Sequence, residues 1–254
     1  STARSAGWQW RIPLQHRTGN GYVFNSDAIS EDEAAATLLA NLDGEALADP
    51  RPLRFVTGIR REPWKRNVVS LGLASGFLEP LESTSIHFIQ SALARLLAFF
   101  PDAGFDAAST SKYNAQTRFE YERCRDFLVL HYRANGRVGE PFWDARRHAP
   151  ISDELAEKLA LFQSHGRIHR FADELFTETG WLQVMVGQGL MPRRPNPMAM
   201  AGDPVPMLDD VRRVLAAAAQ AMPTHEAFIA RHCRAPGAAA PGLSTATALS
   251  GTPA

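Results

Sequence analysis

Residues 70–89 read SLGLASGFLEPLESTSIHFI, and this stretch predicts a strand, a loop of small residues and the start of a helix. The run Asn67–Gly72 is short and rich in β-branched residues, as is typical of a strand. From Thr84 to Phe99 apolar residues recur at helical spacing, and Pro101 ends the pattern. Between strand and helix lie two carboxylates, Glu79 and Glu82, which make this junction a candidate site.

Two interpretations of this junction follow from the residues alone. Small residues allow a flat cofactor to approach the backbone, and the free N–H groups at Thr84, Ser85 and Ile86 would form an anion site at the positive end of the helix. Glu82, just outside that helix, is placed to meet a cation or to accept a proton. Alternatively, Ser83 or Thr84 is a plain helix cap and Glu82 is merely solvated.

The first residues predict a β-hairpin. Trp8, Trp10 and Ile12 alternate with polar residues in a half-buried strand that ends at Pro13. We expect a turn at 18–21 and a return strand at 22–24, with a further strand at 53–60. Gly19-Asn20-Gly21 could open a dinucleotide fingerprint, but Phe24 stands where a third glycine is needed, which favours the hairpin turn.

Helical patterns dominate the rest of the chain. Ser30 and Glu33 form a capping box ahead of a helix at 34–42. Further helices are predicted at 111–134, 153–164, 172–177, 181–190, 208–221 and 224–231. Strands followed by helices indicate a mixed α/β fold. Residues 235–254 are rich in Ala, Gly, Pro, Ser and Thr, and we expect a disordered tail there.

Composition excludes several classes of function. Lys plus Arg and Asp plus Glu both number 27, so no net field favours nucleic acid or a membrane surface. No apolar run approaches the roughly 20 residues that span a bilayer. Cys124 and Cys233 are too few and too far apart for a disulfide framework, which favours a reduced, cytoplasmic setting. The chain has no initial Met and enters a strand at once, so we expect it to be cut from a larger protein.

Two further patterns suggest sites, each with a simpler explanation. His165 and His169 have the spacing of metal ligands on a helix, but Gly166 intervenes and no third ligand is implied, so we expect no metal. Aromatic and acidic residues alternate in the run 171–181, which could sandwich an aromatic substrate bearing an ammonium group. Their spacing alone favours an amphipathic helix with its apolar face inward. The residues of this run are Phe171, Asp173, Glu174, Phe176, Glu178 and Trp181.

Two motifs give the chain a resemblance to a known family. Residues 7–13, GWQWRIP, resemble the W-x-W-x-I-P motif of flavin-dependent tryptophan halogenases, and residues 79–84 resemble their E-P-L-E-S-T segment. The order and separation of the two motifs also fit, and the similarity extends to about Pro192. Related flavin monooxygenases lack the first motif, so it is the more specific of the two.

The resemblance implies a reaction. Reduced FAD, supplied by a separate flavin reductase, forms a flavin hydroperoxide, which chloride or bromide attacks to give hypohalous acid. That acid halogenates tryptophan or another indole. The resemblance implies Glu82 as the catalytic carboxylate and Thr84 with Ser85, where the family often has glycine, as the halide site. The residues implied to line the flavin are Gly72, Leu73 and Ile86, and those of the wall between flavin and substrate are Trp8, Trp10, Ile12 and Pro13.

The same resemblance implies an organisation. Residues 1–100 would be the C-terminal part of a flavin-monooxygenase-like FAD domain and 101–234 a helical substrate cap, followed by the tail. The phosphate-binding loop and catalytic lysine belong to the family's N-terminal part, and Lys65, Lys112 and Lys158 lie in the wrong context for that lysine. We therefore expect the isolated chain to be inactive. A homodimer is compatible with this organisation. The alternatives are an aromatic-hydroxylating flavin monooxygenase and a non-catalytic helical interaction module.

Overall fold

The computed structural model describes residues 1–236 and has a mixed α/β composition in which helices dominate, as the sequence predicts. It contains two compact units, one formed by Ser1–Gln9 with Tyr22–Met200, and one by Trp10–Gly21 with the chain from Ala201 onward. The predicted tail at 235–254 lies almost entirely outside the described residues. The proposed boundary between residues 100 and 101 stays a prediction.

The N-terminal strands form the predicted hairpin with a different turn. Strands β1 (Thr2–Arg4), β2 (Gly7–Pro13) and β3 (Thr18–Phe24) follow one another in a three-stranded sheet. The Leu14 N–H donates to the Arg17 carbonyl at 2.8 Å, so the chain reverses there. The turn predicted at 18–21 is therefore wrong, because these residues lie inside β3.

The glycines of β3 make room for the side chain of Trp10. A Cβ on Gly21 would lie 2.2 Å from the Trp10 ring, and one on Gly19 would lie 3.2 Å from it. Glycine inside a strand often marks a close approach of another group. Here the large indole of Trp10 takes the space, so the glycines report cross-strand packing and belong neither to a turn nor to a dinucleotide fingerprint.

The next segment contains less strand than predicted. Helix α1 (Glu31–Leu39) starts with the predicted capping box but ends before Leu42. Of the strand predicted at 53–60, only β4 (Gly58–Ile59) is present. Of the strand predicted at 67–72, only β6 (Val68–Val69) is present, and it pairs with β5 (Trp64–Lys65). Leu53 and Val56 are 83% and 91% exposed, because β-branched runs need a partner strand and this one has none among the described residues.

The stretch 70–89 forms the junction that the sequence predicts. After the short 3₁₀ helix η1 (Gly72–Ala74), β7 (Gly76–Phe77) pairs antiparallel with β4. A second 3₁₀ helix, η2 (Pro80–Glu82), leads into α2 (Ser85–Ala98). The predicted helix at 84–99 is confirmed, with Thr84 and Phe99 as its two caps.

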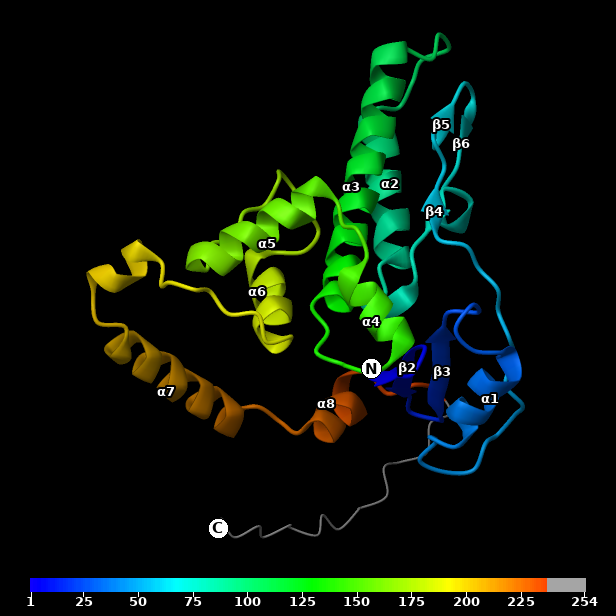
Figure 1. Cartoon of the computed structure of the whole chain (residues 1–254). Helices are drawn as coiled ribbons and strands as arrows, with labels where there is room; N and C mark the ends of the chain where they lie inside the picture. Colours follow the sequence, from blue (N-terminus) through cyan, green and yellow to red (C-terminus); the bar gives the residue numbers. More distant parts are fainter. Residues whose placement is uncertain (237–254) are drawn as a thin grey trace. The chain divides into compact units, whose positions relative to one another are not determined.

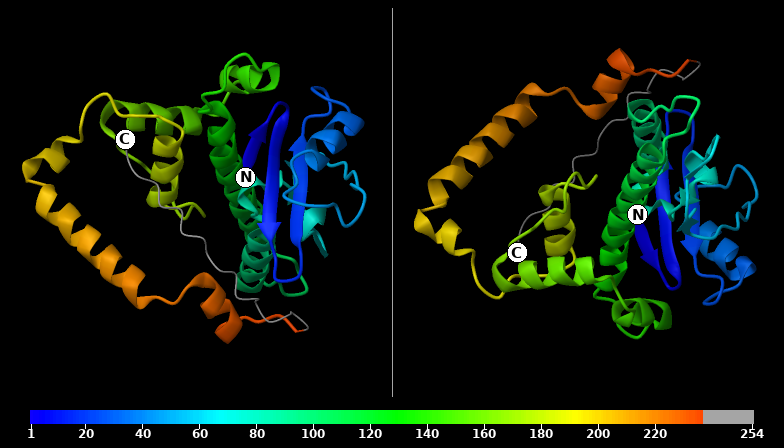
Figure 2. Two further views of the ribbon diagram at one scale, coloured as in Figure 1. Left: turned by 90° about the horizontal axis from the view of Figure 1, so that it is seen from below. Right: turned by 90° about the horizontal axis from the view of Figure 1, so that it is seen from above.

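Helix α3 (Ala107–Arg133) runs unbroken beside α2 and organises the larger unit (Figure 1, Figure 2). It begins four residues before the predicted start, because the Asp106 side chain caps it through the Ser109 N–H at 2.7 Å. Arg95 of α2 donates to Thr117 and Glu120 of α3 at 2.8 and 3.1 Å. These bonds, with Phe88 stacked on Tyr121, hold the two helices in register.

Three shorter helices also pack against α3. They are α4 (Pro141–His148), which the sequence analysis missed, α5 (Asp153–His165) and α6 (Glu178–Gly187). The helix predicted at 172–177 is wrong: Ala172 has φ 55°, and Thr177 caps α6. The core between these helices consists of Phe127, Leu130, Leu155, Phe162, Trp181 and Met185.

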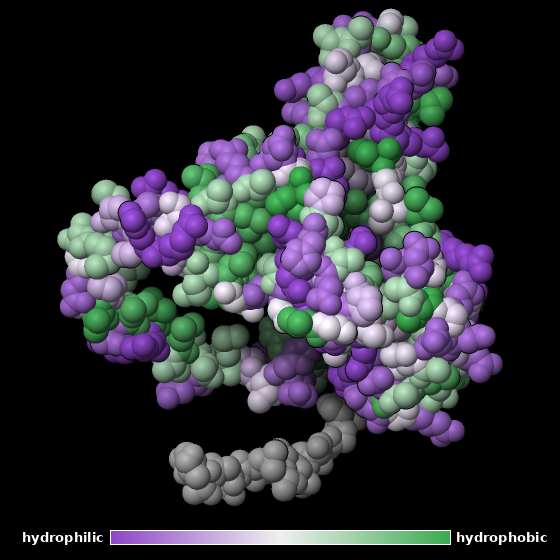
Figure 3. Space-filling model, viewed as in Figure 1, coloured by the Kyte–Doolittle hydropathy of each residue, from purple (hydrophilic) through white to green (hydrophobic). Residues whose placement is uncertain are grey.

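The second unit holds α7 (Val205–Ala221) and α8 (His225–His232), both close to their predicted ranges. Gln15, at the tip of the hairpin, donates to the Cys233 carbonyl and accepts from the Ala235 N–H, each at 2.8 Å. Hydrophobic side chains are exposed along α7 (Figure 3), among them Val205, Met207, Leu208, Val214 and Leu215. None of the helices described in residues 1–236 combines the length and apolar character needed to cross a membrane.

Candidate functional site

Glu82 stands at a strained turn. It is the last residue of η2, and Ser83 after it has the left-handed conformation (φ 53°, ψ 38°). For a non-glycine residue this conformation costs about 1–2 kcal/mol. Strain of this kind is concentrated at functional sites, where the surrounding structure enforces it. The turn joins Glu82 directly to the start of α2.

Glu82 is paired with a histidine that the sequence analysis missed. Its Oε1 lies 3.0 Å from Nε2 of His131 on α3, and Nδ1 of His131 lies 2.9 Å from the Phe127 carbonyl. A carbonyl oxygen can only accept, so Nδ1 carries a hydrogen. Nε2 therefore faces the carboxylate, and Glu82 is not freely solvated.

The pair remains accessible. The Glu82 side chain is 29% exposed and that of His131 is 17% exposed. A partly open carboxylate beside an imidazole has the properties of a candidate general base. No local sequence pattern could have revealed His131, because it lies on a separate helix and only packing brings it to Glu82.

The start of α2 has no side-chain cap. Thr84 is buried and occupies the N-cap position, but its side chain accepts no hydrogen bond from the helix. The Ser83 hydroxyl donates to the Pro80 carbonyl at 3.4 Å instead. The alternative in which Ser83 or Thr84 is an ordinary cap is therefore wrong. The N–H groups at Ser85 and beyond keep the positive end of the helix dipole uncapped.

The residues expected to face the flavin lie around η1 and α2. Gly72 has φ 56°, and a Cβ there would lie 3.2 Å from Ile89 of α2, so only glycine allows η1 to approach so closely. Leu73 and Ile86 are 74% and 71% exposed. A backbone approach next to exposed apolar side chains fits the flat ring of a flavin.

The four residues of the expected wall are divided between the two units. Trp8 is buried, and its Nε1 donates to Glu79 Oε2 at 3.1 Å, which links it to the turn carrying Glu82. Trp10, Ile12 and Pro13 belong to the second unit. Trp10 packs on its cross-strand glycines, whereas Ile12 and Pro13 are exposed. Within the larger unit, only Trp8 joins the Glu82 site.

The aromatic and acidic run at 171–181 encloses a cation that belongs to the chain itself. Lys158 Nζ lies 2.8 Å from Glu174 Oε1 and 4.7 and 4.9 Å from the ring centroids of Phe171 and Trp181. The Trp181 N–H donates to Glu174 Oε2 at 3.2 Å. The predicted amphipathic helix is wrong for residues 171–177, whereas Glu178 and Trp181 lie in α6 and Trp181 faces inward. The cation-binding interpretation has the right chemistry, but Lys158 already takes the place of a substrate ammonium group.

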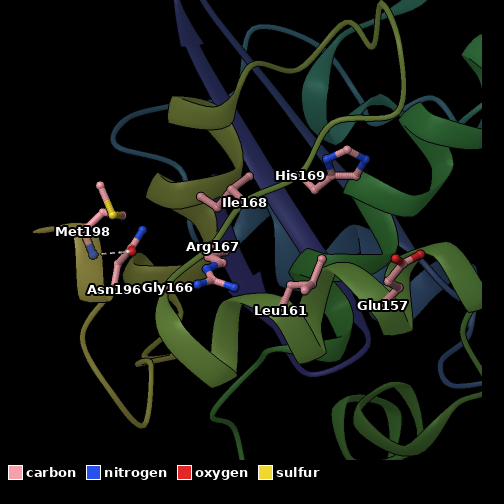
Figure 4. A pocket seen from close by; sticks show the side chains of 8 residues that line it. All are labelled: Glu157, Leu161, Gly166, Arg167, Ile168, His169, Asn196 and Met198. Atoms are coloured by element: carbon pink, nitrogen blue, oxygen red, sulfur yellow. Dashed lines mark hydrogen bonds between the residues drawn. The ribbon is translucent and has the colours of Figure 1, made fainter.

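His165 and His169 do not form a site together. His165 ends α5 and contacts the Ser164 hydroxyl at 2.6 Å. His169 lies beyond the helix, in the wall of an open hollow of about 650 Å³ (Figure 4). The hollow is lined by Glu157, Leu161, Gly166, Arg167, Ile168, His169, Asn196 and Met198, none of them a predicted catalytic residue. Residues 1–236 contain no group of three potential metal ligands.

The comparisons with known proteins agree on one family. The family described as tryptophan halogenase matches residues 1–204. The chain belongs to the tryptophan halogenase family. It is 41% identical over 166 residues to a 7-chloro-L-tryptophan 6-halogenase of Kutzneria sp. (strain 744). The aligned region covers 65% of this chain and 32% of that protein.

Solved structures of flavin-dependent halogenases resemble the fold of this family member. The flavin-dependent halogenase from Xanthomonas campestris is 44% identical to this chain and has a TM-score of 0.88. The match covers 92% of this chain and 48% of the Xanthomonas protein. The flavin-dependent halogenase from Brevundimonas sp. BAL3 is also 44% identical and has a TM-score of 0.86. That match covers 90% of this chain and 47% of the Brevundimonas protein. The chain spans less than half the length of the curated relatives and solved structures named here.

Proposed function

We propose that this chain supplies the catalytic carboxylate, the halide site and part of the flavin-facing surface of an FAD-dependent halogenase acting on tryptophan or another indole. The observation that carries the proposal is the Glu82–His131 pair directly before the uncapped start of α2. A base and an anion site then lie within one turn of the chain, as halogenation of an aromatic ring requires.

The flavin surface supports this proposal. Gly72, Leu73 and Ile86 would contact the isoalloxazine ring, since η1 approaches α2 closely and the two apolar side chains are exposed. Bound FAD, reduced by a separate flavin reductase and reacted with oxygen, supplies the oxidising equivalents that convert a halide to hypohalous acid. Backbone N–H groups at Thr84 and Ser85 would hold chloride or bromide beside the flavin.

Glu82 has two tasks in this proposal. It orients the electrophilic halogen toward the indole and then accepts the ring proton as the new carbon–halogen bond forms and aromaticity returns. The imidazole of His131, 3.0 Å from the Glu82 carboxylate, would take up that proton next. The proton therefore has a path from the ring carbon to the Glu82 carboxylate and then to the imidazole.

The other implied parts are assigned as follows. Trp8, Trp10, Ile12 and Pro13 would separate flavin from substrate, which favours halogenation over direct oxygen transfer. The catalytic lysine of the family is assigned to no residue here, and the Lys158 ammonium is already neutralised by Glu174.

We also propose a reduced, cytoplasmic setting, which the free cysteines support. Burial raises the pKa of the Cys124 thiol to about 12, so that cysteine is unreactive.

The test uses the protein that carries this chain, produced from its complete reading frame. It would be incubated with FAD, a flavin reductase, NADH, bromide and a panel of indoles that includes tryptophan. We expect a product with the bromine isotope doublet in mass spectrometry, and Glu82→Gln should abolish it while flavin binding survives. Oxygen addition without bromine would support the hydroxylating monooxygenase. Failure to bind flavin at all would overturn the proposal in favour of an interaction module.

A further inference from the structure

We propose that Glu79, the first carboxylate of the 70–89 stretch, works as a neutral carboxylic acid that ties Trp8 to the turn carrying Glu82. It would be a positioning residue, because it acts through Trp8 and Glu82 and touches no reacting atom. The inference deepens the proposed function and rests on it for its catalytic consequence. Its structural part stands on contacts within the larger unit.

One oxygen of Glu79 joins two motifs. Oε2 accepts from the Trp8 indole N–H at 3.1 Å and from the Leu81 N–H at 3.2 Å. The first bond reaches the strand that bears the W-x-W-x-I-P motif. The second closes η2, the turn that ends at Glu82. A single carboxyl group therefore sets the position of Trp8 relative to Glu82.

The other oxygen shows why this carboxyl should be neutral. Oε1 is buried and has no hydrogen-bond partner, and no lysine or arginine of residues 1–236 forms an ion pair with Glu79. A negative charge on this partly buried group without a cationic partner is costly, and protonation removes the charge. A hydrogen on Oε1 would also leave Oε2 free to accept both observed bonds.

The neighbouring titratable groups are consistent with this assignment. Burial raises the pKa of Glu79, and it outweighs the opposing hydrogen bonds from Trp8 and Leu81, the nearby Tyr132 hydroxyl and the more distant His131. Burial raises the pKa of Tyr132 as well, so its hydroxyl stays protonated. The imidazole of His131 lies on Glu82 instead.

The decisive experiment is a matched pair of substitutions in the complete protein. Glu79→Gln keeps the shape and the acceptor oxygen but cannot ionise, so we expect kcat/KM within about threefold of the wild type. Glu82→Gln makes the same chemical change three residues later and should lower kcat by about 10²–10⁴-fold, the usual contribution of a positioned base. Glu79→Leu removes the acceptor and should lower kcat/KM at least tenfold.

A second measurement tests the hydrogen bond between Trp8 and Glu79 and does not depend on catalysis. In protein with ¹⁵N-labelled tryptophan, the indole resonance of Trp8, assigned with Trp8→Phe, should stay protected from hydrogen exchange in Glu79→Gln and lose protection in Glu79→Leu. Loss of protection in Glu79→Gln, or retained protection and activity in Glu79→Leu, would overturn the inference. So would a hundredfold loss of activity in Glu79→Gln. A wild type that makes no halogenated product would refute the proposed function alone, because the Trp8 resonance still decides the role of Glu79.

Discussion

Two pairs of a carboxylate and a basic side chain in the larger unit have opposite surroundings. Lys158 and Glu174 are only 2% and 1% exposed and are closed in by Phe171 and Trp181. Glu82 and His131 are 29% and 17% exposed, at a strained turn. The enclosed pair has all its partners inside the chain, whereas the open pair can still meet a substrate. We therefore expect accessibility to separate a structural ion pair from a reactive one.

The two pairs also differ in what their loss would cost. Breaking a buried pair leaves an uncompensated charge in a medium of low polarity, which typically costs about 3–5 kcal/mol of stability. A partly exposed pair is screened by water and contributes roughly 0–1 kcal/mol. We therefore expect substitutions in the enclosed pair to affect folding and those in the open pair to affect chemistry.

The largest effect should come from Lys158→Met. This change leaves Glu174 buried without its cation, so we expect a loss of about 3–5 kcal/mol in the free energy of unfolding. Urea denaturation followed by circular dichroism would measure it. The double substitution Lys158→Met with Glu174→Leu should recover much of that loss, because no buried charge remains. A loss below about 1 kcal/mol in the single variant would mean that the pair is not enclosed.

The open pair is tested by His131→Phe, which keeps an aromatic ring near Phe127 but cannot share a proton. We expect kcat to fall about 10–100-fold, less than in Glu82→Gln, because the base remains and only its proton partner is lost. Stability should change by less than about 1.5 kcal/mol, the usual worth of one hydrogen bond. An unchanged kcat would remove His131 from the proposed proton path. Steady-state bromination of the best indole is the measurement.

Backbone geometry separates the two regions further. Gly72 of the open region has φ 56°, and a Cβ there would press on Ile89, so Gly72→Ala should destabilise the fold by about 1–2 kcal/mol. Gly187 ends the helix that bears Trp181 of the enclosed pair, and a Cβ there meets nothing within 4 Å. Gly187→Ala should therefore stabilise by about 0.5–1 kcal/mol. Thermal unfolding of both variants would show whether the signs differ.

The smallest effect concerns the pH dependence of stability at Glu79. Its pKa is raised in the folded protein above the ordinary value of 4.5. The folded state therefore binds the proton more tightly, and the resulting stabilisation is lost as pH rises through the folded pKa. Glu79→Gln has no such group, so its stability relative to the wild type should improve as pH increases from below 4.5 toward neutrality. A difference that is constant with pH would show that Glu79 ionises normally.

Local patterns in the sequence predicted much of the helical part of the fold. The capping box at Ser30 and the apolar spacing after Thr84 depend on neighbours within one or two turns, and both helices are present. The strand predicted at 53–60 is mostly absent, because a strand requires a partner that no local pattern specifies. The glycines of β3 were mistaken for a turn for the same reason, since Trp10 approaches them from the adjacent strand.

The candidate site divides in a similar way. Glu82 and Thr84 were found from their position before a helix, and the two motifs indicated the family that the comparisons confirm. His131, Glu79 and Lys158 were not assigned their contacts, because each meets its partner across a distance in sequence. In the run 171–181 the spacing favoured an amphipathic helix over a site for a substrate cation, and neither interpretation could reveal that Lys158 supplies the cation.

The sequence by itself determined the family, most of the helices after residue 84 and the short segment in which a carboxylate precedes a helix start. These features depend on residue identity, periodicity and motif order, which are all local along the chain. Only the tertiary structure decided which charges are enclosed and which remain open. That distinction depends on packing and solvent access, because the same carboxylate is structural when buried with its cation and reactive when water and substrate can reach it.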